Sequence, residues 1–170
     1  MIQVAVAGSG DTELLPEAER KARSFARALP PDVALLTGGK GGIMEVVSEE
    51  FVRRGGTVVG ILPGDEEGNP FNLVRIKTGL NPVGRSVVLV GSADVLVVLG
   101  GGSGTMVEAL MAYNIGVPVV VLTGTGYRSD RLKALVEDGS FDHRNRADVV
   151  FTDDPDEAVR LALRLARSRA

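Results

Sequence analysis

A chain of 170 residues is long enough to bury one core and too short for two ordinary domains, so residues 1–170 are expected to form a single domain. The 19 basic and 22 acidic residues leave a net charge of −3 without a long run of one sign, which argues against nucleic acid as a partner. The chain has no cysteine, which excludes a disulfide framework, thiolate metal sites and a cysteine nucleophile.

The chain begins with "MIQVAVAGSG", which enters an apolar run without a basic leader or a cleavage site. No apolar run approaches the roughly 20 residues of a membrane span, so we expect a cytoplasmic protein that does not contact a membrane. The first apolar run, 2–7, is followed by similar short, β-branched runs: 33–36, 57–62, 94–99, 117–122 and 148–151. These runs do not alternate with polar residues, which is typical of parallel strands covered on both faces.

Helices are expected between these strands. In 13–29 the apolar residues recur at spacings of three and four and form one stripe on a charged helix: Leu15, Ala18, Ala22, Phe25, Ala26 and Leu29. Asn81 followed by Pro82 predicts a second helix start, and Asp154 with Glu157 predicts a capping box at the last helix. This alternation predicts an α/β fold, with a Rossmann-like, doubly wound parallel sheet and helices on both faces.

Glycine-rich segments follow several predicted strands: "AGSGD", "TGGKGGIME" and "GGGSGT". In doubly wound sheets, ligands bind beyond the carboxyl ends of the strands, where the strand order reverses. A glycine loop between a strand and a helix also lets backbone N–H groups converge on an anion. One such loop is weak support, because tight turns need glycine anyway. Together the loops favour a phosphate or phosphate-like ligand. The irregular segment 63–73 is interpreted as a surface loop rather than a mobile flap.

Familiar nucleotide and hydrolase motifs fail in this sequence. Glu13 stands where the dinucleotide fingerprint needs its third glycine, and the only Gly-Lys pair, at Lys40, is followed by another glycine rather than by serine or threonine. Ser103 lacks the histidine partner of a catalytic triad, and the single histidine, His143, cannot build a metal cluster. We therefore expect no metal ion and no cofactor.

Glu108 allows two interpretations. Thr105 and Glu108 form the pattern T-x-x-E, which is typical of a helix capping box, and local sequence alone favours this role. A carboxylate one turn inside a phosphate-binding helix also lies a sugar's width from the phosphate, where it could act chemically. Two anions at that distance need a nearby cation, and Arg85 is the candidate.

The segment "GRSVVLVGSADVLVVLGGGSGTMVEALMAYNIGVPVVVLTGTGYRSDRL" resembles the LONELY GUY (LOG) family of nucleoside 5′-monophosphate phosphoribohydrolases, long labelled lysine decarboxylases. The family motif P-G-G-x-G-T-x-x-E matches Gly100 to Glu108, with glycine in place of proline, and the family's arginine falls on Arg85. Upstream, "AGSGD" is similar to the family's C-G-S-S loop and "GGKGGIME" to its G-G-x-x-G-L-M-G loop. Two further departures, Ser86 for a lysine and Glu45 for a glycine, are similar to a branch that includes molybdenum-cofactor carrier proteins.

The resemblance implies hydrolysis of the N-glycosidic bond of a purine or N6-substituted nucleoside 5′-monophosphate to free base and ribose 5-phosphate. Glu108 would stabilise the oxocarbenium-like sugar or activate water, and Arg85 would hold substrate oxygens or the leaving base. The residues expected to bind the phosphate or line the crevice are Gly8, Ser9, Gly39, Gly42, Met44, Gly101, Gly102, Ser103, Gly104 and Thr105.

The resemblance also implies a homodimer. The alternative is a carrier that binds a phosphorylated ligand such as molybdenum cofactor without turnover. Lysine decarboxylation is rejected, because no lysine lies in a recognisable pyridoxal-phosphate site.

Overall fold

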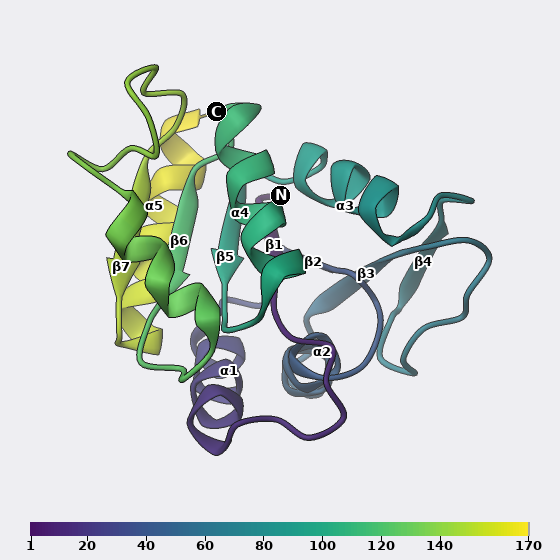
Figure 1. The fold of residues 1–170 in the computed structure, drawn as a ribbon. Helices are drawn as coiled ribbons and strands as arrows, with labels where there is room; N and C mark the ends of the chain where they lie inside the picture. Colours follow the sequence, from purple (N-terminus) through teal and green to yellow (C-terminus); the bar gives the residue numbers. More distant parts are fainter. Residues whose placement is uncertain (170) are drawn as a thin grey trace.

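The computed structural model describes residues 1–169, which form one parallel sheet of seven strands with helices on both faces (Figure 1). The strands are β1 (Gln3–Ala7), β2 (Ala34–Thr37), β3 (Thr57–Leu62), β4 (Val74–Lys77), β5 (Val95–Val98), β6 (Val119–Leu122) and β7 (Val149–Thr152). The helices are α1 (Pro16–Ala28), α2 (Ile43–Arg53), α3 (Pro82–Gly91), α4 (Ser103–Asn114) and α5 (Pro155–Arg169), with a 3-10 helix, η1 (Arg128–Leu135). In this part of the chain, no helix is long and apolar enough to cross a membrane.

The strand order β4-β3-β2-β1-β5-β6-β7 confirms the predicted doubly wound sheet. The direction of winding reverses at β1, where Ala5 pairs with Leu36 of β2 on one side and with Leu96 of β5 on the other. The segments after β1 and β5 therefore leave the same edge of the sheet as neighbours. This is the position at which ligands bind in doubly wound folds.

The sheet is buried on both faces, which explains the uninterrupted apolar runs. Along β5, Val95 and Val97 belong to the core beneath α1, α2 and α5, whereas Leu96 and Val98 belong to the core beneath α3 and α4. Successive side chains of a strand point to opposite faces, so a central strand such as β5 must supply apolar residues to both cores.

Two predicted helix caps are present. The side chain of Asn81 accepts a hydrogen bond from the Gly84 N–H at 2.8 Å, and Asp154 accepts one from the N–H two residues further on at 2.9 Å. The predicted capping box at α5 is wrong, because Glu157 bonds to Arg160 on its own helix at 2.7 Å instead of reaching back to Asp154.

The sequence did not predict β4, which forms one edge of the sheet beside β3. All four of its residues are exposed, and the strand reads "VRIK", so it lacks the continuous apolar character of the central strands. The preceding segment, 63–73, is a loop whose Asn69 N–H and Asn72 side chain both donate to the Gly39 carbonyl, at 2.7 and 2.9 Å. This loop is thereby joined to the loop that follows β2.

Candidate functional site

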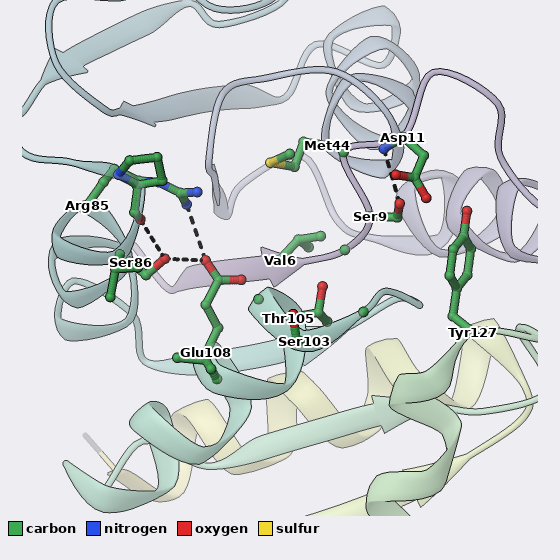
Figure 2. Close-up of a pocket in the computed structure, with 17 residues that line it drawn as sticks. Val6, Ser9, Asp11, Met44, Arg85, Ser86, Ser103, Thr105, Glu108 and Tyr127 are labelled. Carbon is green, nitrogen blue, oxygen red and sulfur yellow. Dashed lines mark hydrogen bonds and ion pairs between the residues drawn. The ribbon is translucent and has the colours of Figure 1, made fainter.

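A cavity of about 580 Å³ opens beyond the carboxyl ends of β1 and β5 (Figure 2). Its volume lies within the range of about 300–1,000 Å³ that small-molecule sites occupy. The predicted site residues that line it are Gly8, Ser9, Met44, Arg85, Gly102, Ser103, Gly104, Thr105 and Glu108. The sheet thus brings together four segments that are far apart in the sequence.

Ser9 joins the three predicted glycine loops through its backbone. Its N–H donates to the Gly100 carbonyl after β5, and its carbonyl accepts from the Ile43 N–H at the start of α2, both at 2.8 Å. The loops after β1, β2 and β5 therefore form one hydrogen-bonded unit.

Several glycines permit this close packing. A Cβ atom on Gly42, whose φ is +67°, would lie 2.2 Å from the Ser9 carbonyl oxygen. One on Gly101 would lie 2.0 Å from Thr105 Oγ1, and one on Gly8 would lie 2.5 Å from an Ile43 methyl carbon. These glycines are required because backbone and side chains approach too closely for a Cβ atom.

Three residues predicted to contact a ligand do not line the cavity in residues 1–169: Gly39, Gly42 and Gly101. Gly42 and Gly101 pack the loops against one another, whereas Gly39 holds the loop at 63–73 through its carbonyl. Glycine patterns in the sequence do not distinguish a loop that contacts a ligand from a loop that supports its neighbour.

Helix α4 begins at Ser103 rather than at Thr105, with Gly102 as its N-cap. Its first internal hydrogen bond runs from the Met106 N–H to the Gly102 carbonyl at 3.1 Å. The N–H groups of the first turn have no helical acceptor, and they lie at the cavity, where they can bind an anion. The predicted capping box is therefore wrong: Thr105 is inside the helix, and α4 has no side-chain cap.

The Glu108 carboxylate is directed away from the start of α4 and towards α3 (Figure 2). Its Oε1 accepts a hydrogen bond from Ser86 Oγ at 2.8 Å and lies 3.3 Å from Arg85 Nη1. All three residues are buried, with Glu108 only 7% exposed. Burial raises the pKa of Glu108, although the charge of Arg85 and the hydrogen bonds from Ser86 and Arg85 act in the opposite direction. Within residues 1–169, Oε2 accepts no hydrogen bond and is available to a ligand.

The guanidinium of Arg85 lies across Gly38. A Cβ atom on Gly38 would be 2.6 Å from Arg85 Nη1 and 2.7 Å from Met44 Sδ, so a side chain there would displace both groups. The Nε atom of Arg85 is buried and has no hydrogen-bond partner in the part of the chain that the structure describes. Arg85 thus has unused hydrogen-bonding capacity beside Glu108.

The glycine loops and family motifs did not indicate that Asp11 and Tyr127 line the cavity. Asp11 belongs to "AGSGD", so its place in the first glycine loop was already a signal. Tyr127 follows β6 in "TGTGYRS", a further glycine-containing loop after a strand. Ser86 was noticed only as a departure from a family pattern, and the sequence did not indicate its hydrogen bond to Glu108.

The chain belongs to the SLOG cluster4 family, within the LOG-like superfamily, and matches that family over residues 1–159. This confirms the resemblance found in the motifs. An uncharacterised protein of Archaeoglobus fulgidus is 35% identical over 125 residues, which cover 72% of this chain and 80% of that protein.

Two solved structures extend the comparison. The X-ray structure of TM1055 is 36% identical, with a TM-score of 0.85 and coverage of 96% of this chain and 99% of that one. The molybdenum cofactor carrier protein of Chlamydomonas reinhardtii is 28% identical, with a TM-score of 0.75 and coverage of 98% of both chains.

Gly42→Ala is expected to destabilise the protein by about 2 kcal/mol or more, because the new Cβ atom overlaps the Ser9 carbonyl and the positive φ disfavours alanine. Urea unfolding measures the loss. Gly55→Ala is the matched control, because Gly55 also has a positive φ, +82°, but has nothing within 4 Å of the added Cβ atom. Equal losses in the two variants would contradict a packing role for Gly42.

Proposed function

We propose that this cavity binds a nucleotide through its phosphate and that the protein hydrolyses the N-glycosidic bond of that nucleotide. The simplest substrate is a purine or N6-substituted nucleoside 5′-monophosphate, which gives free base and ribose 5-phosphate. The observation that carries the proposal is the position of the Glu108 carboxylate. It is buried against Arg85 and Ser86 of α3, and it belongs to α4, the helix whose first turn opens into the cavity.

The phosphate is assigned to the first turn of α4. Free N–H groups there and the hydroxyls of Ser9, Ser103 and Thr105 supply hydrogen bonds around one position in the cavity. The helix dipole places partial positive charge at the same end. Because Glu108 follows on the next turn of α4, the ribose of a nucleotide bound in this way lies beside its carboxylate.

Glu108 acts on the sugar. As the bond from the anomeric carbon to the base breaks, its electron pair leaves with the base and the sugar becomes oxocarbenium-like. The ionised Oε2 stabilises this cation or accepts the proton of the water whose oxygen bonds to the anomeric carbon, and the departing base takes up a proton from solvent. Arg85 donates hydrogen bonds to substrate oxygens or to the leaving base. The Ser86 hydroxyl fixes the other carboxylate oxygen, Oε1, and so orients Glu108.

Glu108→Gln is expected to lower turnover of AMP or an N6-substituted AMP by about a hundredfold or more while the protein stays folded, because glutamine cannot act as a base. Release of free base is followed by chromatography, and circular dichroism checks the fold. Glu137→Gln, an exposed carboxylate away from the cavity, is the control and should leave turnover unchanged.

The second candidate is a carrier that binds without turnover, favoured by the similarity to the molybdenum cofactor carrier protein. No release of base above that of an Arg85→Ala, Glu108→Ala double variant would refute the hydrolase. If molybdopterin then raises the melting temperature of the protein and nucleotides do not, the carrier function replaces it.

The acid limb of the pH profile of kcat/KM is expected above the ordinary range of a glutamate, because Glu108 acts when ionised and burial raises its pKa. Activity falls as pH drops through this pKa. Ser86→Ala removes a hydrogen bond that favours the carboxylate, so the limb should move to higher pH. Ser92→Ala is the control, because Ser92 donates to the Val88 carbonyl at the end of the same helix. An unchanged limb in Ser86→Ala would exclude this role for Ser86.

We also propose that the protein forms a homodimer through α3 and α4. Within 82–91 and 103–114 the only charged residues are Arg85 and Glu108, and both are buried. The exposed side chains of these helices include Val83 and Val87, which are 65% and 54% exposed, and Val107, which is 45% exposed. An uncharged apolar face can pair with a copy of itself without repulsion between like charges.

Val87→Glu is expected to convert the dimer to a monomer, because the interface would bury two unpaired carboxylates, one from each copy. Size-exclusion chromatography with light scattering measures the mass. Leu15→Glu, which adds the same charge before α1, should leave the mass unchanged. A monomeric native protein at micromolar concentration would rule out the dimer.

A further inference from the structure

The cavity continues past the first turn of α4 on the side away from Glu108 (Figure 2). Arg85 and Glu108 lie at one end, the first turn of α4 with Ser103 lies in the middle, and Asp11 and Tyr127 lie at the opposite end (Figure 2). A nucleotide bound with its phosphate at α4 and its ribose at Glu108 leaves the end at Asp11 and Tyr127 empty. The group that fills this end must be attached to the far side of the phosphate.

Tyr127 is held in place by its surroundings. Its N–H donates to Thr125 Oγ1 at 3.2 Å, and Thr125 Oγ1 in turn donates to Asp130 at 2.6 Å. The Tyr127 hydroxyl accepts from the Leu15 N–H at 3.4 Å, and its ring lies close to Gly100, where an added Cβ atom would be 3.1 Å from Cδ2. The half-buried ring is thereby presented to the cavity in a fixed position, as a surface on which a planar group can stack.

The charges around the cavity disfavour a terminal phosphate. Among residues 1–169, Arg85 is the only basic residue that lines it, and Arg85 is already paired with Glu108. Asp11 adds a further carboxylate, so the lining side chains carry a net charge of −1 when Glu108 is ionised. A phosphate monoester carries about −1.5 to −2 at neutral pH. Esterification of the phosphate on both sides leaves a single negative charge, which the N–H groups and dipole of α4 can balance.

We propose that the natural ligand is a nucleotide 5′-phosphodiester, with a second planar group, such as another nucleoside, between Tyr127 and Asp11. The inference rests on the proposed position of the phosphate at α4. The Tyr127 ring stacks on the second group, and the Asp11 carboxylate accepts hydrogen bonds from its hydroxyl or amino groups. The cleaved glycosidic bond is unchanged, so the second group stays attached to the ribose phosphate.

Calorimetry on the Glu108→Gln variant tests the inference, because that variant binds without turnover. The ligands are AMP, its 5′-phosphate methyl ester, and the dinucleoside monophosphate adenylyl-(3′→5′)-adenosine. In this variant Asp11 is the remaining carboxylate at the cavity among residues 1–169, so the methyl ester, which has lost one charge, should bind more tightly than AMP. The dinucleotide should bind at least about tenfold more tightly than AMP through stacking. In this background Tyr127→Leu should weaken the dinucleotide about tenfold and AMP less than twofold, whereas Tyr127→Phe should retain both affinities.

Asp11→Asn separates charge from stacking. It should strengthen AMP binding several-fold, because a carboxylate no longer faces the dianion, and should change the dinucleotide little, since asparagine keeps an acceptor oxygen. If AMP binds as tightly as the dinucleotide, or if Tyr127→Leu weakens both equally, the phosphodiester inference is overturned and the proposed hydrolase stands. Binding of neither nucleotide overturns the proposed function and the inference with it.

Discussion

The site depends on the backbone of Ser9, whose N–H and carbonyl are bonded to the loops after β5 and before α2. Both bonds are made by main-chain atoms, so they place no demand on the Ser9 side chain, whose hydroxyl accepts a hydrogen bond from the Asp11 N–H at 3.1 Å. They do require that neighbouring residues lack a Cβ atom, as at Gly42 and Gly101. This arrangement positions the first turn of α4 beside the loop that follows β1. The direction of α4 then determines where the Glu108 carboxylate lies.

The role proposed for Glu108 carries a cost in stability. Because burial raises its pKa in the folded state above that in the unfolded chain, the folded state holds the proton more tightly. The corresponding stability is fully present below the unfolded pKa and is lost as pH rises through the folded pKa. Ionising Glu108 in the folded protein therefore costs stability, and Arg85 and Ser86 reduce that cost. A carboxylate retained under such conditions is typical of functional sites.

The sequence predicted the order of central strands and helices because both sheet faces are buried and leave continuous apolar runs. It missed β4 because an exposed edge strand needs no such pattern. Local spacing alone favoured a capping box for Glu108, because the alternative depends on α3 lying beside α4, a tertiary contact that local spacing does not contain. The family motif placed Arg85 and Glu108 in register, but the supporting residues Gly38 and Ser86 became evident only from the side-chain contacts.

Gly38 has a consequence for how such proteins diverge. Because Gly38 has no side chain, the guanidinium of Arg85 can pack directly against its backbone. The volume of the residue at position 38 therefore limits the length and shape of a cationic side chain at position 85 of α3. The side-chain volumes at positions 38 and 85 therefore constrain each other, although the two positions are far apart in the chain. A larger residue at position 38 would displace the Arg85 guanidinium and the Met44 sulfur from their present positions, so a lineage that changes position 38 must also reposition this cation.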